Sequence, residues 1–427
     1  MTDITAQPAM NDRHAQEKMN RKRIVVVTVA DLPEGGGRTG RLRTLVAALG
    51  ALGHQVEIWN EHGLSSESSE NESVSGELAG APFHYVLGRT ERGHGFGATR
   101  TKIQAVRAIA AGLRRQKTSV PVDMVIFNNL SFYDTFPLTR LARRLGARTI
   151  QCYEDERLEL LPDPNGNISF AQRLFGLNSW LADRYCSRMA DAIFVISTYL
   201  QQKYARLNRQ PKKVHLIPTI VDCEAWRLPP EDEPNPARIF YAGRLATQDD
   251  LFVLAQALSI LKRQGFEFQL ALAGGDRGEK RMDQFLAGCR SLGIEENVEV
   301  LGFLKHEKLK GQIARSHLLV NLRQRSTWSV SGQSTKLSEY LASGRAVLTT
   351  DLGDNARYVE HERSAFVVSP EVSPDQLACL LKRVLTDSEL RIRVGAGGRR
   401  AAETYFDVPV IRERLRSILA AVFEELA

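Results

Sequence analysis

Residues 331–360 read SGQSTKLSEYLASGRAVLTTDLGDNARYVE, and this stretch decides the fold. It predicts a loop, a helix that begins near Thr335, and then a buried strand at 345–351. Backbone N–H groups at the start of such a helix attract phosphate oxygens, and Lys336 adds a positive charge there. Glu339 lies one turn further on, where its carboxylate can accept hydrogen bonds from two vicinal ribose hydroxyls. The stretch therefore indicates a nucleoside diphosphate bound across a helix N-terminus.

The alternation of apolar strands and amphipathic helices continues on both sides of this stretch. In the second half, the strands are predicted at 237–245, 268–275, 298–304, 317–323, 345–351 and 364–370. In the first half, they are predicted at 23–30, 54–59, 83–88, 122–128, 148–154 and 192–197. Short apolar runs with helices between them form parallel sheets that are covered on both faces. We therefore predict an α/β protein with two Rossmann-like, doubly wound parallel-sheet domains that face a cleft.

The predicted domain organisation follows from the length of 427 residues, which exceeds what one core normally holds. Residues 1–20 are polar and are expected to be a disordered leader, and 21–222 form the N-terminal domain. A proline- and acid-rich linker is expected at 223–236, followed by the C-terminal, nucleotide-binding domain at 237–407. The helix predicted at 408–427 has apolar positions at helical spacing, and we expect it to pack back toward the N-terminal domain.

The composition excludes several classes of protein. Hydrophobic residues make up 43% of the chain and charged residues 25%, which is typical of folded globular proteins. No apolar run is long enough for a transmembrane helix, and the first residues do not resemble a signal peptide, so we expect a cytoplasmic protein. The five cysteines and nine histidines show no metal-ligand spacing, and no metal site is predicted. The Ser- and Glu-rich stretch 64–77 is expected to be a loop.

A glycine-rich stretch, LPEGGGRTGRLRTL at 32–45, contains G-x-G-x-x-G at Gly35, Gly37 and Gly40. In dinucleotide-binding sites the first glycine follows the strand almost at once. Here the residues ADLPE separate the predicted strand from Gly35, which makes the loop too long for that geometry. The stretch is compatible with a nicotinamide dinucleotide, a structural loop, or a loop whose Gly36 and Gly37 let the backbone approach a phosphorylated ligand. We favour the third interpretation.

The net charge of +7 is concentrated in the first half of the chain. Lys and Arg are dense in 89–117, where Glu91 is the one acidic residue, and four arginines follow in 140–148. This predicts an anionic partner, which we take to be a phosphate-bearing substrate or an anionic membrane surface contacted by 98–117 and 140–148. Nucleic acid is not expected, because aromatic residues do not interrupt the basic stretch. The alternative is a surface helix whose apolar stripe faces its own sheet. That stripe consists of Ile103, Val106, Ala110 and Leu113.

Several of these segments together resemble the retaining GT-B glycosyltransferases of family four, also called glycosyl transferases group 1. The resemblance covers nearly the whole chain and is strongest from Ile239 to Phe406. It is carried by YAGRL (241–245), GFL (302–304), STKLSEYLASGRAVLTTDLG (334–353), ADAIFVIS, VHLIPTIVD and ELRIRVGAGGRRAAETYFD (389–407). It implies transfer of a sugar from a nucleotide sugar to an acceptor with retained anomeric configuration. It also implies that neither a metal nor another cofactor is required.

The resemblance assigns roles to individual residues of the C-terminal domain. Arg244, at the end of a predicted strand, would clamp the diphosphate together with Lys336, and Glu339 would contact the ribose. The backbone at Phe303 and Leu304 would recognise the base. The complete predicted donor site comprises Gly36, Gly37, Gly243, Arg244, Phe303, Leu304, Thr335, Lys336, Leu337 and Glu339.

Three positions depart from the pattern of the family. Ser331 stands where the family has the first of two glutamates, which lies beside the sugar, and Asp249 stands where it has a diphosphate-binding lysine. The family's histidine that faces the sugar is replaced by the sequence around Glu154 and Asp155. We place Glu154, Asp155 and Ser331 at the reacting sugar as catalytic candidates. A solvated loop is the alternative for the acidic pair.

The resulting prediction is a glycosyltransferase of bacterial cell-surface polysaccharide or glycolipid assembly. Its partners would be a nucleotide-sugar donor and a lipid-linked or saccharide acceptor, met at the inner face of the cell membrane. Two alternatives stay open: a catalytically degenerate protein of the same fold with a binding or regulatory role, and a nicotinamide-dependent oxidoreductase.

Overall fold

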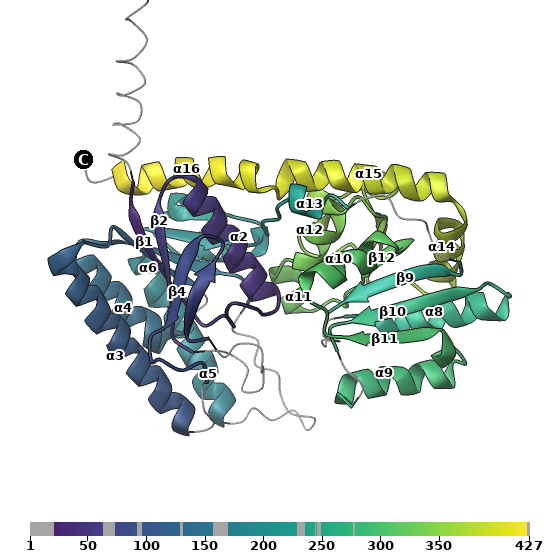
Figure 1. Cartoon of the computed structure of the whole chain (residues 1–427), viewed down its shortest axis with the longest axis horizontal. Helices are drawn as coiled ribbons and strands as arrows, with labels where there is room; N and C mark the ends of the chain where they lie inside the picture. Colours follow the sequence, from purple (N-terminus) through teal and green to yellow (C-terminus); the bar gives the residue numbers. More distant parts are fainter. Residues whose placement is uncertain are drawn as a thin grey trace, which may run out of the picture. The chain divides into compact units, whose positions relative to one another are not determined.

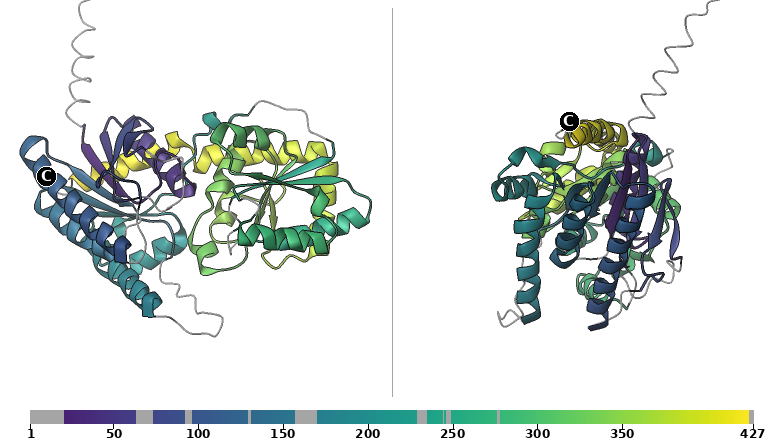
Figure 2. Two further views of the ribbon diagram at one scale, coloured as in Figure 1. Left: turned by 60° about the horizontal axis from the view of Figure 1, so that its bottom comes forward. Right: turned by 90° about the vertical axis from the view of Figure 1, so that its left-hand side faces the viewer.

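The structure is a computed structural model that describes residues 21–62, 73–91, 96–128, 131–156, 170–228, 235–243, 245, 249–275 and 278–424. It divides into two compact units, which we call the N-terminal unit and the C-terminal unit (Figures 1 and 2). The N-terminal unit comprises Met1–Ile196, Leu200–Ile217 and Ile411–Ala427. The C-terminal unit comprises Ser197–Tyr199 and Pro218–Val410. The end of the chain therefore belongs to the same unit as its beginning.

The described part of the N-terminal unit contains a sheet with the strand order β3-β4-β2-β1-β5-β6-β7-β8. Neighbouring strands are parallel, except that β3 is antiparallel to β4. The strands are β1 Arg23–Thr28, β2 Gln55–Asn60, β3 Ser75–Leu78, β4 Ala81–Tyr85, β5 Met124–Asn128, β6 Arg148–Tyr153, β7 Ala192–Val195 and β8 Val214–Leu216.

The central strands of this sheet form because their residues are apolar and buried on both faces. Ile24 in β1 has no exposed surface and lies opposite Val56 on one side and Met124 on the other. The chain leaves β1 toward β2 on one side, and β5 takes the other side of β1. The carboxyl ends of β1 and β5 therefore form the switch point at which open α/β sheets bind ligands.

Helices cover both faces of the sheet in the N-terminal unit. Ile109 and Leu113 in α3 and Leu138 in α4 share one core cluster with Val25 and Phe127 of the sheet. The predicted stripe of α3 thus packs mostly on its own sheet, whereas Ile103 is half exposed. The helices are α2 Gly37–Ala51, α3 Phe96–Ser119, α4 Phe132–Arg144, α5 Phe170–Leu181, the π-helix η1 Ala182–Cys186, α6 Ser187–Met189, α7 Thr198–Leu207, the 3₁₀ helix η2 Pro211–Lys213 and α16 Val408–Glu424.

The C-terminal unit contains a second parallel sheet, with the order β11-β10-β9-β12-β13-β14. Its switch point lies between β9 and β12, because the chain moves from β9 toward β10 on one side and returns with β12 on the other. The strands are β9 Ala237–Ala242, β10 Phe268–Ala273, β11 Val298–Gly302, β12 Leu318–Asn321, β13 Val347–Thr350 and β14 Phe366–Val368.

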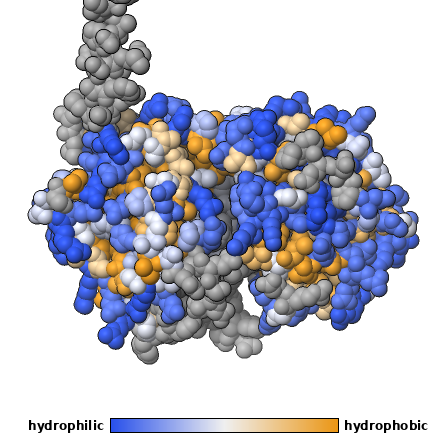
Figure 3. Space-filling view, viewed as in Figure 1, coloured by the Kyte–Doolittle hydropathy of each residue, from blue (hydrophilic) through white to orange (hydrophobic). Residues whose placement is uncertain are grey.

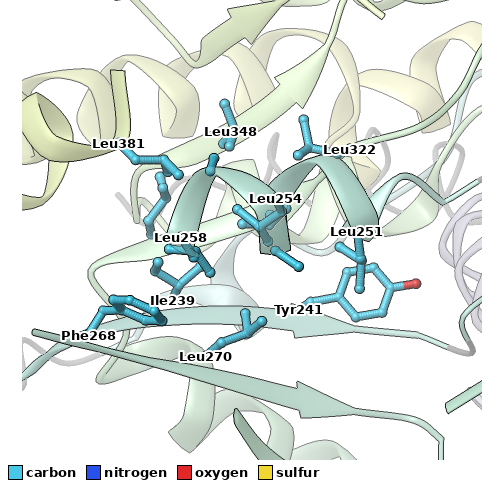
Figure 4. Packing of buried hydrophobic residues seen from close by; sticks show 14 of the residues in the cluster. Ile239, Tyr241, Leu251, Leu254, Leu258, Phe268, Leu270, Leu322, Leu348 and Leu381 are labelled. Carbon is cyan, nitrogen blue, oxygen red and sulfur yellow. The ribbon is translucent and has the colours of Figure 1, made fainter. Parts of the chain in front are cut away.

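The core on one side of this sheet is closed by α8 and α14. Leu254 and Leu258 of α8 pack against Ile239 and Leu270 of the sheet, and Tyr241 borders the same cluster with its hydroxyl pointing away from it (Figure 4). The helices of this unit are η3 Glu224–Trp226, α8 Leu251–Arg263, α9 Lys280–Ser291, η4 Glu295–Asn297, α10 His306–Ala314, α11 Thr327–Ser331, α12 Thr335–Ala342, α13 Asn355–Tyr358, α14 Pro374–Thr386 and α15 Ser388–Tyr405.

The predicted fold class, two doubly wound parallel sheets, is confirmed, while one local prediction is wrong. The stretch 64–77 was expected to be a loop, yet Ser75–Leu78 forms β3. Its residues 64–72 lie outside the described residues. The strand forms because Ala79 and Gly80 adopt positive φ angles of 52° and 80°, which turn the chain back onto β4. Backbone hydrogen bonds with β4 thus override the polar composition of this segment.

Candidate functional site

Three neighbouring strands of the C-terminal unit end in glycines that leave their edge without side chains. Gly243, Gly274 and Gly302 follow or end β9, β10 and β11 and have φ angles of 145°, 97° and 65°. Gly243 N–H donates to the Ala273 carbonyl at 2.8 Å, and Gly274 N–H donates to the Gly302 carbonyl at 2.8 Å. A Cβ at Gly274 would lie 2.9 Å from the Gly243 backbone. We call these three glycines the glycine floor, a surface that only backbone can form.

The N-terminus of α12 follows β12 at the carboxyl edge of the same sheet. Ser334, the N-cap residue, makes no side-chain capping bond to the first turn, and its hydroxyl donates to Asn321 Oδ1 at 2.9 Å. Thr335 begins the helix and is half-buried, while Leu337 is buried and anchors the first turn in the core. The positive end of the helix dipole is therefore available to an anion.

Lys336 directs its ammonium group over the glycine floor. A Cβ at Gly243 would lie 3.0 Å from Lys336 Nζ. The Nζ atom is 3.0 Å from the Tyr241 hydroxyl, 4.2 Å from the centroid of that ring and 3.3 Å from Asp249 Oδ1. Burial lowers the pKa of Lys336, and the Asp249 carboxylate opposes that shift. The predicted phosphate-binding lysine is thus held at the end of β9.

Tyr241 and Asp249 complete a small network that sequence reasoning missed as a unit. The Tyr241 hydroxyl donates to Asp249 Oδ2 at 2.7 Å, and burial together with Asp249 raises the pKa of Tyr241. Asp249 therefore binds the lysine side chain instead of repeating the positive charge of the family pattern. The Tyr of YAGRL was the available signal, since it is the last large side chain before Gly243.

Among the other predicted donor residues, Glu339, Phe303 and Leu304 lie in the same unit, whereas Gly36 and Gly37 belong to the N-terminal unit. Glu339 is half-buried one turn after Lys336, and the next residue, Tyr340, accepts a hydrogen bond from Ala242 N–H at 2.8 Å, which ties α12 to β9. Phe303 is 57% exposed and Leu304 is half-buried, directly after the glycine floor. Arg244 lies outside the described residues.

Ser331, predicted beside the sugar, ends the short helix α11 and has no exposed surface. Its carbonyl oxygen accepts a hydrogen bond from the Ser197 hydroxyl. Gly353, with φ of 58°, brings the loop after β13 against this helix, because a Cβ there would lie 2.9 Å from the Val330 carbonyl oxygen. The structure therefore places Ser331 in a packed region of the C-terminal unit.

The acidic pair predicted at the sugar lies at the carboxyl edge of the N-terminal sheet. Glu154 follows β6, is 7% exposed and forms an ion pair with Arg41 of α2, at 2.8 Å between Oε2 and Nη2. Asn128 Nδ2 lies 3.5 Å from the other carboxylate oxygen. Asp155 is half-buried. Arg41 was missed by sequence reasoning, although it lies within the glycine-rich stretch and directly follows Gly40.

The glycine-rich stretch leads into α2. Leu32 is buried, and its N–H donates to the Tyr85 hydroxyl at 3.0 Å, which fixes the long loop after β1. Gly36 is the N-cap residue and Gly37 the first residue of α2, and both are exposed. Arg41 lies one turn later on the same helix, so the start of α2 and the end of β6 are joined by the Arg41–Glu154 ion pair.

A second buried carboxyl group, Glu61, follows β2. It has no exposed surface, and neither of its side-chain oxygens has a hydrogen-bond partner. Burial and the nearby Asp134 raise its pKa well above the usual value, and Lys102 opposes that shift. Lys102 itself is bound to Asp134, at 3.1 Å. This edge thus contains at least two buried acids next to cations.

Two further observations concern the described residues alone. Among them, no three His, Cys, Asp or Glu side chains are grouped so that they could hold a metal ion. No helix in the described part of the chain has the length and apolar character of a membrane span.

Both halves of the chain match families of known proteins. Residues 224–401 match the family described as glycosyl transferases group 1, and residues 36–219 match the glycosyl transferase 4-like domain. Together the two matches identify the chain as a glycosyltransferase with a 4-like N-terminal domain and a group 1 C-terminal domain. The structure is similar to that of HepE from Anabaena in complex with UDP and glucose, with a TM-score of 0.68 and 15% identity over 94% of this chain and 100% of HepE. This likeness confirms the predicted GT-B fold.

Two curated relatives of this glycosyltransferase are transferases by name. Alpha-D-kanosaminyltransferase of Streptomyces kanamyceticus is 23% identical over 260 residues, which cover 57% of this chain and 63% of the relative. The amylovoran biosynthesis glycosyltransferase AmsK of Erwinia amylovora is 24% identical over 231 residues, which cover 54% of this chain and 56% of AmsK. The matched region thus spans less than two thirds of either relative.

Proposed function

We propose that this glycosyltransferase transfers a sugar from a nucleotide-sugar donor to an acceptor with retention of anomeric configuration. The observation that carries the proposal is the position of Lys336 Nζ over the glycine floor, next to the start of α12. A backbone floor lets a diphosphate approach closely, while the ammonium group and the helix N-terminus balance its charge. The complex of the similar HepE structure with UDP and glucose supports a donor of this class.

The proposed chemistry follows from the leaving group. When the bond between sugar and diphosphate breaks, negative charge develops on the diphosphate, and Lys336 and the α12 dipole stabilise that charge. Arg244 is proposed to assist in this stabilisation. We propose that Glu339 accepts hydrogen bonds from the ribose and that the backbone at Phe303 and Leu304 contacts the base. No metal or other cofactor is required in this proposal.

The N-terminal unit is proposed to supply the acceptor side. Glu154 and Asp155 at the end of β6 are our candidates for contact with the reacting sugar, with Arg41 as the residue that orients Glu154. The exposed Gly36 and Gly37 are proposed to let backbone approach the donor phosphates. For Ser331 we retain a role in positioning the sugar, exerted through the packed helix α11.

We further propose an acceptor in cell-surface polysaccharide or glycolipid assembly, lipid-linked or saccharide, at the inner face of the cell membrane. Support comes from AmsK, which is named for amylovoran biosynthesis. The basic segments 98–117 and 140–148 support contact with an anionic surface, since nearly all of their charged side chains are positive.

A thermal-shift screen against UDP, GDP, ADP and CMP, followed by a transfer assay, tests the proposal. A nucleotide at 100 times its Kd should stabilise the protein by about 2.7 kcal/mol. Proton NMR of the product should then show the anomeric configuration of the donor. Failure of all four nucleotides to stabilise the chain would contradict the donor site, and an inverted product would contradict retention. Binding without turnover would identify a degenerate protein, and a response to NADH alone would identify an oxidoreductase.

A further inference from the structure

One side of the N-terminal unit is a layer of the helices α3, α4 and α5. α3 packs against α4, and α4 packs against α5 and the π-helix η1 (Figures 1 and 2). The described face of α5 exposes large apolar side chains that a water-facing helix normally lacks. Leu174 is 45% exposed, Leu177 is 51% exposed and Trp180 is 46% exposed. Their spacing of three residues places them along one face of the helix.

An aromatic cluster joins this face to the start of α4. The Trp180 and Tyr185 rings are 6.4 Å apart, and Tyr185 lies 6.4 Å from Phe132. Phe132 in turn lies 4.9 Å from Phe136 and 6.2 Å from Tyr133, whose side chain is exposed. We call the exposed members Tyr133, Leu174, Leu177, Trp180 and Tyr185 the aromatic face. In Figure 3, apolar residues interrupt the hydrophilic surface of the N-terminal unit.

The charges around the aromatic face are of one sign. In the described parts of α3, α4, α5, η1 and α6, the carboxylates are Asp134 and Asp183. Both are buried and paired, Asp134 with Lys102 and Asp183 with Lys203. The exposed cations of this layer are Arg100, Arg107, Arg114, Arg115, Lys117, Arg140, Arg143, Arg144, Arg173 and Arg188. In the described part of this layer, exposed apolar side chains lie on helices whose exposed charges are positive, which indicates an anionic partner with an apolar interior.

We propose that this layer docks on an anionic lipid bilayer, with the aromatic face inserted at the level of the headgroups. Trp and Tyr prefer this interface, and Leu174 and Leu177 gain from leaving water. The arginines remain at the phosphate level. A second copy of the chain is a poor partner, because it would bring two basic surfaces together. A single-stranded nucleic acid would stack on Trp180 and Tyr185 but would not bury the leucines.

This inference rests on the proposed function only for its biological purpose, and it differs from the contact expected at 98–117 and 140–148. Neither of those segments contains the aromatic face. Charge alone would give binding that disappears at high salt, because exposed charges are screened. Insertion of apolar side chains would leave a part of the binding that salt does not remove.

Flotation of the full chain with vesicles tests the proposal. We expect binding to vesicles of phosphatidylglycerol and phosphatidylcholine and weak binding to vesicles of pure phosphatidylcholine. A fraction of the protein should stay bound to the anionic vesicles at high salt. Leu177→Glu with Trp180→Glu should lower partitioning at least about tenfold at every salt concentration, since two inserted side chains are lost. Arg114→Glu with Arg115→Glu should lower it at low salt and leave the salt-resistant part. Ile392→Glu, at a 69% exposed position of α15 in the C-terminal unit, is the matched control and should stay within about twofold.

Fluorescence gives a second readout in a chain without added charges. Trp59 and Trp226 are buried, so a Trp328→Phe background leaves Trp180 as the one exposed tryptophan of the four. We expect its emission to shift to shorter wavelength and to be quenched by brominated lipid when anionic vesicles are added. An unchanged spectrum, equal binding to neutral and anionic vesicles, or full binding by the double variant Leu177→Glu with Trp180→Glu would overturn the proposal. Preferential binding of poly(U) over vesicles would also overturn it.

The docking proposal and the proposed function can be contradicted independently of each other. UDP binding and turnover of a water-soluble donor are measured without vesicles, and the aromatic-face variants should leave both unchanged. A chain that turns over donor but never floats would contradict the docking surface alone. A chain that floats but binds no nucleotide would contradict the proposed function alone.

Discussion

The carboxyl edges of the two sheets carry different chemical groups, although the strands that form both edges are parallel and both sheets are doubly wound. In the C-terminal unit, the edge is a floor of three glycines with Lys336 held over it by Tyr241 and Asp249. In the N-terminal unit, the edge is filled with buried carboxyl groups next to cations, including Glu61 near Lys102 and Glu154 bound to Arg41. A diphosphate suits the first edge, and a neutral, hydroxyl-rich molecule suits the second.

One sheet architecture can thus present either its backbone or its side chains to a ligand. Glycines with positive φ keep side chains off the first edge, so that the start of α12 and a single ammonium group can face an anion there. Carboxyl groups that are paired with cations or protonated offer an anion no net attraction, yet their oxygens can accept hydrogen bonds from hydroxyl groups. Substitutions at the carboxyl edge of one sheet should therefore act independently of those at the other.

The largest effect is expected from Arg41→Met. The substitution leaves Glu154, 7% exposed, without its guanidinium partner. We expect unfolding of the N-terminal unit to become easier by about 3 kcal/mol, at the lower end for broken buried ion pairs because the Arg41 side chain is 16% exposed. Urea denaturation followed by Trp59 fluorescence measures this.

The double variant Arg41→Met with Glu154→Gln should recover most of that stability, because no unpaired charge remains buried. Turnover should stay low in the double variant if Glu154 contacts the reacting sugar. Arg43→Met, on the same helix with a loose 3.5 Å ion pair to Glu34, is the control and should change stability by less than about 1 kcal/mol. Equal losses of stability in Arg41→Met and Arg43→Met would show that the Arg41–Glu154 ion pair stabilises the protein no more than the Arg43–Glu34 ion pair does.

The next effect concerns the C-terminal edge, where Lys336→Ala should weaken UDP binding by about 1.5 to 3 kcal/mol through loss of a charge-assisted hydrogen bond. Asp249→Asn should act in the opposite direction, because it removes the carboxylate 3.3 Å from the ammonium group. Isothermal titration calorimetry with UDP at low and high salt measures the effect of each substitution on affinity. Lys262→Ala, an exposed lysine at the end of α8, is the matched control. Unchanged affinity in Lys336→Ala would remove the lysine from the diphosphate site.

The fold was predictable because its signals are local and repeated. Runs such as RIVVVT in β1 are apolar, largely β-branched and buried, and most of them are followed by a helix. β3 escaped prediction because Ser75–Leu78 has no apolar pattern and exists through its pairing with β4. Pairing of that kind depends on the turn at Ala79 and Gly80, which the composition of the stretch conceals.

The site was predictable only where its residues are neighbours in sequence. Lys336 and Glu339 lie one turn apart on α12, so helical spacing alone relates them. The Tyr241–Lys336 contact joins positions 95 residues apart, and the Arg41–Glu154 pair joins two distant elements, so neither could be found without the fold. Arg41 was therefore not predicted as a site residue, although it lies within the glycine-rich stretch 32–45.

A smaller effect is expected from Glu339→Gln. The amide keeps one acceptor oxygen but loses the negative charge, so UDP affinity should fall by about 1 kcal/mol if Glu339 holds the ribose. The measurement compares UDP with its 2′,3′-dideoxy analogue in both proteins. The parent should prefer UDP, and the variant should lose most of that preference. If removing the hydroxyls costs the variant as much as the parent, Glu339 does not touch the ribose.

The smallest effect is expected from Glu61→Gln, as a change in how stability depends on pH. Burial and Asp134 raise the pKa of Glu61 well above 4.5 in the folded state. Between 4.5 and the raised value, the folded protein therefore holds a proton that the unfolded chain has released, and stability falls as pH rises through that window. The amide cannot titrate, so the variant should lose less stability than the parent as the pH rises above about 5. Urea midpoints read by Trp59, with Glu77→Gln on the exposed strand β3 as control, measure the difference. Parallel pH profiles for parent and Glu61→Gln would mean that Glu61 is ionised in the fold and that the N-terminal edge carries more negative charge than we infer.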